Sequence, residues 1–239
     1  MMRKIKALGI VVGATLALSA ALASAAQAET GVLTTGGFPS IVTGEKVNAG
    51  PTFDVGVVRN VTCATSDLEA TLFGPIDPVT FKPRYEGCTS EPGVTPVTVT
   101  LNGCDYTIGF SRPGTTGTPM TTGLMHAWLN CPAGQQIEIH VYENAVQHAE
   151  NISVCTYDIG PQGPVPAGIY HNTFGAMTDV DATINARFTA RSTIGAGGAI
   201  CGGDPMTQHL PITLTGNYTL RGFMDNGGFE GAQIPVDVG

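Results

Sequence analysis

Carboxylate and amide side chains gather in one short segment near the C-terminus of this chain. Asp225, Asn226 and Glu230 all fall within residues 225–231, DNGGFEG. Their oxygens are ligands of the kind that Ca²⁺ prefers, but the spacing of an EF-hand loop is absent. The Asn226-Gly227 pair is also typical of a plain turn with positive φ angles. We therefore predict a turn here and keep these three residues as weak calcium candidates.

The histidines do not form a zinc-protease motif, because the pattern His-Glu-x-x-His does not occur. His140, Glu143 and His148 lie near one another in sequence and are the one set that suggests a metal site. Histidines on a solvent-facing strand or in a loop are the favoured interpretation. The full set is His126, His140, His148, His171 and His209.

The sequence also lacks the motifs that support nucleophilic catalysis. No Gly-x-Ser-x-Gly turn is present to carry an activated serine. The cysteines are expected to be oxidised, which removes any thiolate nucleophile. We therefore predict no catalytic residue, no cofactor and no enzymatic activity, with a secreted hydrolase as the least favoured alternative.

Two aspartates, Asp179 and Asp181, lie on the same face of one predicted strand. Hydrolysis of a glycoside needs two carboxylates held about 5–10 Å apart in a cleft. Solvated charges that protect a strand from edge-to-edge aggregation are the simpler interpretation, and we favour it over a cation site.

Aromatic side chains on the surface would indicate a carbohydrate-binding face, but only 7% of the residues are aromatic. The single tryptophan, Trp128, sits in an apolar strand and is expected in the core. Tyr142 and Tyr157 are expected to be exposed and are the candidates for stacking on a ligand.

The first 28 residues are predicted to be a secretory signal peptide. A basic start (Arg3, Lys4, Lys6) precedes an alanine-rich apolar stretch, and small residues before Glu29 form a cleavage site. The apolar stretch is shorter than the ~20 residues of a membrane-spanning helix. The mature chain, 29–239, is therefore expected to be secreted, with no membrane span.

Charge and composition exclude several classes of partner. Removing the leader takes the formal net charge from −8 to −11, because its only charged residues are basic. Such a chain has no electrostatic basis for binding nucleic acid. A hydrophobic content of 42% with 13% charged residues also argues against disorder. The partner itself stays open, with a glycan or a cell-envelope component as the candidate class.

Alternating apolar and polar residues predict strands through most of the mature chain. Examples are the segments 97–101, 137–142, 179–188 and 212–221. Each pattern indicates a strand with one buried and one solvated face, as in an antiparallel sandwich. Only residues 143–150 look helical, and that stretch is too short to be stable alone.

Glycine and proline clusters separate the strands and suggest the organisation of the chain. Residues 29–50 are expected to form an extended N-terminal segment. We predict an all-β, antiparallel sandwich-type fold, stapled by disulfides. The sequence leaves open whether it is one domain or two lobes, which would be residues 51–135, with the two hairpin disulfides, and residues 136–239.

Six cysteines in an exported chain indicate three disulfides rather than a zinc site, because no two of them lie two to four residues apart. Many connectivities are open. The hairpins that the sequence suggests favour Cys63–Cys88 and Cys104–Cys131, which leaves Cys155–Cys201.

Several strings recur in an order that resembles one known family. They are YEGC at 85–88, NGCDY at 102–106, CPAG at 131–134, then Cys155 and Cys201. The chain resembles uncharacterised secreted six-cysteine all-β proteins that occur in many copies in soil actinobacteria, over roughly residues 55–239. The resemblance implies a bacterial, exported, disulfide-bonded protein and no catalytic activity. Residues 142–153 are longer here than in that family.

These observations together predict a secreted, non-enzymatic protein that acts as a structural or binding module of the cell envelope or extracellular milieu. A glycan- or calcium-binding extracellular module is the alternative.

Overall fold

The computed structural model describes residues 29–47, 52–55, 60–90, 95–112, 122–173, 178–194, 209–225 and 230–238. The predicted signal peptide and most of the glycine-rich connections lie outside these ranges. The first strands are β1 (Glu29–Gly31), β2 (Leu33–Thr35), β3 (Ser40–Lys46), β4 (Phe53–Asp54), β5 (Asn60–Leu72), β6 (Val79–Ser90), β7 (Thr95–Thr100) and β8 (Asp105–Arg112). They are followed by β9 (Thr122–Asn130), β10 (Ile137–Val141), α1 (Ala145–Ala149), β11 (Cys155–Ile159), β12 (Gln162–Thr173), β13 (Asp179–Ile194), β14 (His209–Asp225), β15 (Glu230–Ile234) and β16 (Val236–Val238).

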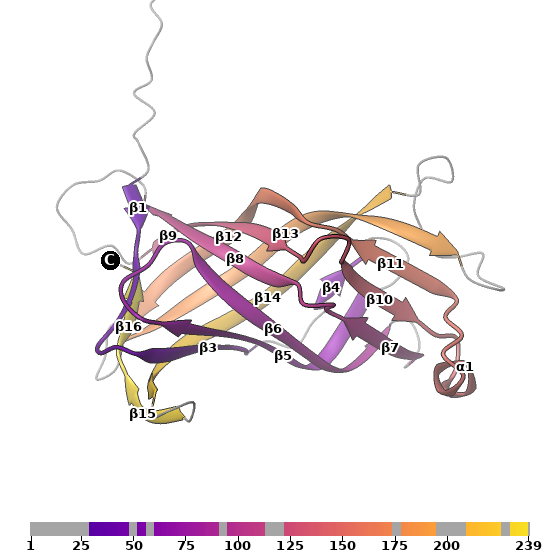
Figure 1. Ribbon diagram of the computed structural model, residues 1–239, viewed down its shortest axis with the longest axis horizontal. Coiled ribbons are helices and arrows are strands. Elements are labelled where there is room, and N and C mark those ends of the chain that lie inside the picture. Colours follow the sequence, from indigo (N-terminus) through magenta and orange to yellow (C-terminus); the bar gives the residue numbers. More distant parts are fainter. Residues whose placement is uncertain are drawn as a thin grey trace, which may run out of the picture.

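The predicted all-β, antiparallel fold is confirmed. One large sheet contains nearly all strands, and it closes on itself through the order β6-β8-β9-β12-β13-β14-β3-β5 and back to β6. Two walls of strands therefore face each other across a common core and are joined at both edges (Figure 1). This closure removes most free strand edges, which would otherwise invite aggregation.

The long strands β6 and β13 each change neighbours part of the way along. β13 pairs with β12 over Asp179–Ile184 and with β11 over Arg191–Ile194. β6 pairs with β8 over Val79–Phe81 and with β7 at Thr89 and Ser90. We call these two places the β13 fork and the β6 fork. The strands β7, β10 and β11 extend the wall beyond the forks toward α1 (Figure 1).

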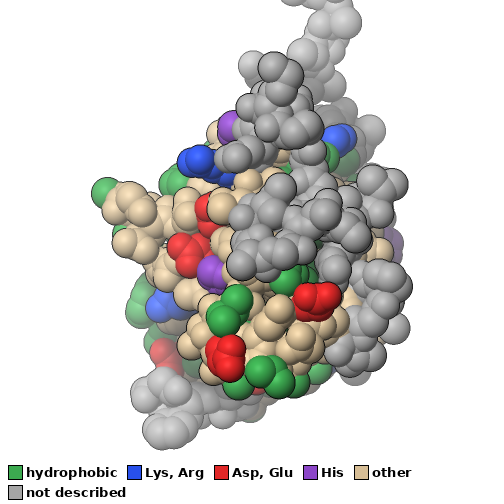
Figure 2. Space-filling model, turned by 90° about the vertical axis from the view of Figure 1, so that its right-hand side faces the viewer, with side chains coloured by type: hydrophobic (Ala, Val, Ile, Leu, Met, Phe, Trp, Pro, Cys, Tyr) green, Lys and Arg blue, Asp and Glu red, His purple; other side chains and the backbone are tan. Residues whose placement is uncertain are grey.

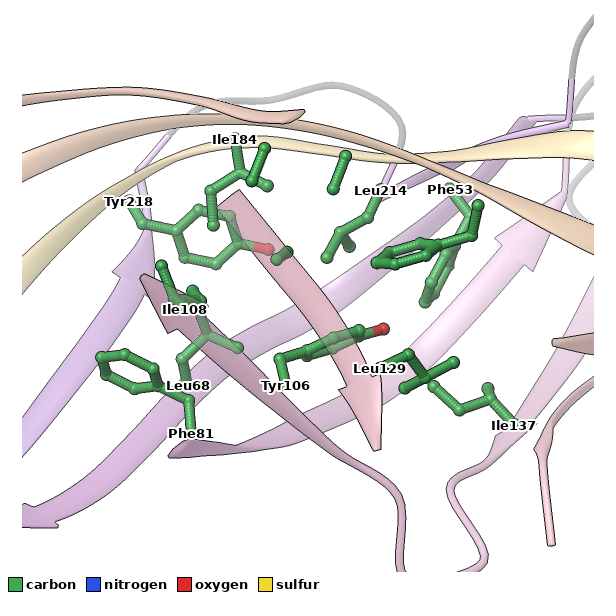
Figure 3. Close-up of a cluster of buried hydrophobic side chains, with 14 of the residues drawn as sticks. Phe53, Leu68, Phe81, Tyr106, Ile108, Leu129, Ile137, Ile184, Leu214 and Tyr218 are labelled. Atoms are coloured by element: carbon green, nitrogen blue, oxygen red, sulfur yellow. The ribbon is translucent and has the colours of Figure 1, made fainter. Parts of the chain in front are cut away.

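The core follows from the period-two pattern of the strands. In β13 the even-numbered residues from Val180 to Ser192 are buried, while the odd-numbered residues from Asp181 to Thr193 are exposed. Side chains from the two walls meet in one cluster, in which Phe81, Tyr106, Leu129 and others point toward one another (Figure 3). Their burial supplies the main favourable free energy of folding, at ~25 cal/mol per Å² of apolar surface.

Strands from the two predicted lobes share this sheet and this core. Strands on either side of residue 135 pair directly in β7–β10, β9–β12 and β3–β14. The predicted extended segment 29–50 supplies β1, β2 and β3 over its described part. A small second sheet of β2 and β16 is fastened to β12 by Asn172, whose side-chain amide donates to the Val238 carbonyl at 2.9 Å and accepts from its N–H at 3.1 Å.

Two disulfides join strands that are also neighbours in the sheet. Cys63 and Cys88 are bonded and lie directly opposite each other in β5 and β6. Cys104 and Cys131 are bonded where the β8–β9 hairpin ends. Both pairs are among those favoured by the sequence. Cys155 is also disulfide-bonded, and its expected partner Cys201 lies outside the described residues.

Candidate binding surface around Trp128

Trp128 lies on the outside of the closed sheet, so its predicted place in the core is wrong. In β9 the odd-numbered residues from Gly123 to Leu129 are buried, and the even-numbered ones face outward. Trp128 therefore shares a face with Leu124, His126 and Asn130. It is only half-buried there.

Two glycines on the neighbouring strands make room for the indole. A Cβ atom on Gly109 of β8 would lie 3.1 Å from Cζ3 of Trp128. One on Gly163 of β12 would lie 3.0 Å from Cδ1 of Trp128 and 2.8 Å from the backbone of β9, and Gly163 also has φ +133°. The six-membered ring is therefore next to one neighbouring strand and the five-membered ring next to the other. Gly109 is buried although its position faces outward, because the indole covers it. The tryptophan thus lies along the sheet over bare backbone.

Polar groups border the indole on the side of β8. Thr107 lies directly opposite Trp128, and its Oγ1 accepts a hydrogen bond of 2.7 Å from Nδ2 of Asn130. Thr107 also shares a 3.0 Å hydrogen bond with Thr80 of β6. These hydroxyl and amide groups can exchange hydrogen bonds with a polar ligand without leaving a buried group unsatisfied.

Two apolar side chains lie farther along the same outer face, beyond His126. Leu124 of β9 and Ile169 of β12 are directly opposite each other and are 52% and 47% exposed. We call the outward-facing set Thr107, Leu124, His126, Trp128, Asn130 and Ile169 the Trp128 surface. It combines a flat aromatic group with aliphatic and hydrogen-bonding side chains, which is the composition of a ligand-binding site.

The stacking candidates Tyr142 and Tyr157 are buried, so their predicted exposure is wrong. They are 4% and 0% exposed. Tyr157 shares the inward face of β11 with Cys155 and Ile159. The ring of Tyr142 packs against the imidazole of His148, with a centroid distance of 4.8 Å.

Of the calcium candidates, Asp225 ends β14 and is opposite Glu230 of β15 in the strand register. Its backbone N–H donates to the Pro39 carbonyl at 3.2 Å. Asn226 and the rest of the turn lie outside the described residues, so the calcium prediction stays a prediction. Within the described ranges, histidine, cysteine, aspartate and glutamate side chains form no group of three suited to a metal ion.

Of the suggested metal set His140, Glu143 and His148, the two histidines contact different residues. His140 of β10 contacts Glu138 at 3.3 Å and Thr156 at 3.2 Å. His148 of α1 contacts Thr98 at 3.4 Å.

The predicted pair Asp179 and Asp181 does share the outward face of β13. Asp179 is 3.7 Å from Nε of Arg221. Asp181 accepts a 2.8 Å hydrogen bond from Thr219. Both carboxylates thus have partners on β14.

A charged groove on the outer face of β3, β5, β6 and β14 was not foreseen. Its volume is about 390 Å³, and its lining includes Glu45, Asp67, Glu69, Lys82 and Arg84. Arg84 pairs with Asp67 at 2.7 Å, and Arg221 pairs with Glu45 at 3.2 Å. Cross-strand pairing brings these charges together from segments far apart in sequence. Because they largely neutralise one another, the groove offers a ligand less unpaired charge than its composition suggests.

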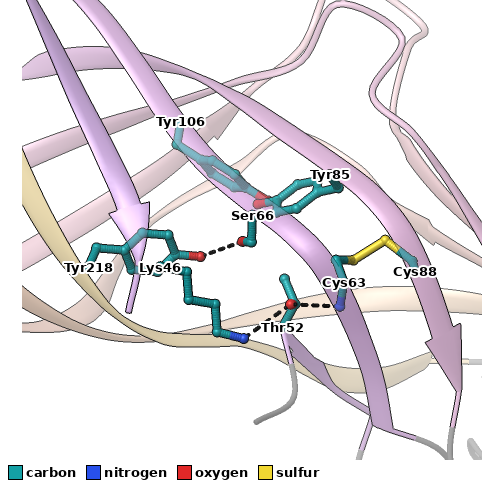
Figure 4. The surroundings of a disulfide bond; sticks show 8 residues. All are labelled: Lys46, Thr52, Cys63, Ser66, Tyr85, Cys88, Tyr106 and Tyr218. Carbon is teal, nitrogen blue, oxygen red and sulfur yellow. Dashed lines mark hydrogen bonds between the residues drawn. A yellow bond between two sulfur atoms is a disulfide. The ribbon is translucent and has the colours of Figure 1, made fainter. Parts of the chain in front are cut away.

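A network of hydroxyl groups inside the closed sheet was also not foreseen (Figure 4). Ser66 and Tyr218 share a 2.7 Å hydrogen bond, and the Tyr85 hydroxyl lies 3.4 Å from that of Tyr106. Burial raises the pKa of Tyr218 to about 12, an effect opposed by its hydrogen bond with Ser66. These phenols therefore stay protonated at physiological pH.

Replacing Asp158 of β11 by asparagine is expected to stabilise the protein at pH 7. Burial raises the pKa of Asp158, and Glu138, directly opposite on β10, raises it further. The folded state then binds the proton more tightly than the unfolded state, so stability falls as pH rises through the window above the unfolded pKa of about 3.9. Asp158→Asn removes this penalty. Urea titrations at pH 7 and at pH 3 should show a gain at the first pH only; an equal gain at both would contradict the assignment.

Within the described ranges, no helical segment has the length and apolar character needed to cross a bilayer. No family model, curated protein or solved structure matches this chain.

Proposed function

We propose that this protein is a secreted, non-enzymatic binding module that holds extracellular glycans on the Trp128 surface. The observation that carries the proposal is the position of the indole, outside the sheet and over the backbone of Gly109 and Gly163. The two disulfides support an extracellular location, because such bonds persist in oxidising compartments.

The cost of leaving a tryptophan half exposed supports a binding role. A tryptophan side chain carries roughly 150–250 Å² of surface that burial would stabilise. Here the chain instead places Gly109 beneath the indole, and a glycine in a strand costs up to about 1 kcal/mol relative to alanine. A flat, preformed aromatic group next to Thr107 and Asn130 offers a sugar ring both an apolar face and hydrogen bonds. Because the indole is already held in place, little conformational entropy is lost on binding.

Tryptophan fluorescence tests the proposal directly, because Trp128 is the only tryptophan in the chain. Soluble oligosaccharides of chitin, cellulose, xylan and peptidoglycan are titrated into the oxidised protein. We expect one class to shift the emission saturably, because a sugar ring on the indole excludes water. Isothermal titration of Trp128→Ala should then show affinity lower by about 30-fold, the ~2 kcal/mol typical of a central aromatic.

Phe73→Ala is the matched control, since Phe73 is an aromatic residue that is 83% exposed outside the Trp128 surface. It should bind the same oligosaccharide with unchanged affinity. A panel without any fluorescence shift, or equal affinity of Trp128→Ala and the unaltered protein, would overturn the assignment of glycan binding to this surface.

A further inference from the structure

The β6 fork leaves an opening in the wall of the sheet, on strands that do not form the Trp128 surface. β6 and β7 pair only at Thr89–Pro96 and Ser90–Thr95. Beyond this point they separate, and a crevice of about 300 Å³ lies between them. Its lining includes Tyr85, Cys88, Val97, Thr98, Val99 and His148. We call it the β6–β7 crevice.

Backbone groups of β7 face into this crevice. On its other side β7 pairs with β10 over Val97–Thr100, and the carbonyl of Pro96 accepts a hydrogen bond of 3.2 Å from Tyr142 on that side. In an antiparallel strand the N–H and C=O of one residue point the same way, and successive residues alternate. Thr98 therefore points its backbone groups toward β10. Val97 and Val99 point theirs toward β6. Proline has no N–H, so the pairing of Thr89 with Pro96 uses the N–H of Val97 at the end of the β6–β7 ladder. The carbonyl of Val97 and both backbone groups of Val99 face the crevice, where no described strand pairs with them.

The β13 fork shows how a similar gap is closed elsewhere in this chain. There the side chain of Gln162 accepts a hydrogen bond of 2.7 Å from the N–H of Thr189 and donates one of 2.9 Å to its carbonyl. The amide side chain thus takes the place of a neighbouring strand. Among the described residues, no side chain is hydrogen-bonded in this way to Val97 or Val99. A polar backbone edge of this kind favours a hydrogen-bonding partner.

Packed and cross-linked side chains line part of the crevice. The ring of Tyr85 packs against Phe53, with a centroid distance of 4.9 Å, and its hydroxyl is 3.4 Å from that of Tyr106. Cys88 is fixed by its disulfide to Cys63 (Figure 4). A ligand side chain that entered here would meet preformed walls, which limits the entropy lost on binding.

Charge around the crevice indicates which partner fits. Glu86 adjoins the lining on β6, and Glu143 and Glu150 flank α1, which lies against β7; all three are exposed. Arg84, a nearby cation on β6, is paired with Asp67. Acidic, basic, histidine and hydrophobic side chains are all visible on the end of the molecule viewed in Figure 2. A basic partner is favoured, and a second copy is disfavoured because the chain itself carries a net charge of −8.

We propose that the β6–β7 crevice binds an extended peptide segment with alternating apolar and basic residues, which adds to β7 as a further strand. Its backbone pairs with the carbonyl of Val97 and with the N–H and carbonyl of Val99, and an apolar side chain packs on Tyr85. Addition of a strand to a sheet edge is a common mode of peptide recognition, in which main-chain hydrogen bonds supply affinity and side-chain pockets supply specificity. This activity does not depend on glycan binding at the Trp128 surface.

The test uses the full secreted chain with its disulfides intact and a fluorescein-labelled peptide of alternating valine and lysine. Anisotropy should show saturable binding, and a peptide with glutamate in place of lysine should bind at least about tenfold more weakly. Methylating the backbone nitrogens of every second residue gives two peptides of opposite phase. One of them should lose binding by at least about tenfold, because its hydrogen bonds to β7 are blocked, and the other should not.

Val99→Pro is the matched change in the protein, because it removes an N–H that faces the crevice and leaves the β10-facing groups of Thr98 and Thr100 in place. It should weaken binding of the valine–lysine peptide by about tenfold, while circular dichroism shows that the variant stays folded at the assay temperature. If this variant fails to fold, the two methylated peptides still decide the question. Equal binding of both phases, no saturable binding, or a concentration-dependent dimer that excludes the peptide would overturn the proposal.

Discussion

Replacing Cys63, Cys88, Cys104 and Cys131 together by alanine is expected to unfold the protein at 37 °C. The two bridges span 25 and 27 residues, and closing loops of that length stabilises a fold by about 3 kcal/mol each. The summed loss of about 6 kcal/mol is comparable to the ~5–15 kcal/mol that separates folded from unfolded states of a typical domain. Circular dichroism at increasing temperature and urea titration, followed by Trp128 fluorescence, measure the loss.

Each bridge should also be removed singly, with serine and alanine versions of each pair compared. Cys63, Cys88 and Cys104 are each less than 10% exposed. A serine hydroxyl at these positions would add a desolvation cost of about 1–3 kcal/mol that alanine avoids. The alanine versions therefore isolate the effect of the bond. A loss below about 1 kcal/mol for each alanine pair would contradict the view that the bridges hold this sheet together.

Gly168→Ala should be the most damaging single substitution outside the cysteines. Gly168 of β12 has φ +123°, a region that side chains rarely adopt. It sits where the β9–β12 register shifts, and a Cβ there would overlap the carbonyl oxygen of Thr183 on β13. Both effects act on backbone, which cannot move without breaking the β12–β13 pairing. We expect a loss of at least about 4 kcal/mol, the range of exceptional single mutations.

Gly160→Ala is the matched control. Gly160 lies just before β12, its φ is not in the positive range, and nothing lies within 4 Å of a Cβ placed on it. The melting temperature of the Gly160→Ala variant should stay within about one or two degrees of that of the unaltered protein, since surface substitutions of this kind change stability by about 0.5 kcal/mol or less. Similar melting temperatures for the two variants would show that the β12 bulge tolerates a side chain, contrary to our expectation.

The face that Trp128 occupies shows why part of the site escaped the sequence. In β9, both sets of alternate residues contain large apolar side chains: Leu124 and Trp128 on one face, and Met125 and Leu129 on the other. Local alternation therefore gave no reason to place the indole outside. The deciding residues are Gly109 and Gly163, which lie on two other strands. Only their pairing with β9 shows that the indole has room on the outer face.

Tyr157 is a different case, because its burial was readable from its own strand. Cys155, Tyr157 and Ile159 alternate with Thr156 and Asp158, and this pattern puts the tyrosine on the apolar face. Tyr142 follows β10, at the end of the alternating pattern, and is held by its contact with His148.

The amino-acid sequence predicted many of the strands, the cysteine pairs of the two hairpins, and the all-β fold. These properties are local, because the period of two and a hairpin's register depend on residues within a short stretch of chain. Closure of the sheet through β6–β8 and β13–β14, the Trp128 surface and the β6–β7 crevice were decided by the tertiary structure. Alternation specifies which face of a strand is buried but not which strand lies beside it. That choice depends on packing among segments as far apart as β3 and β14.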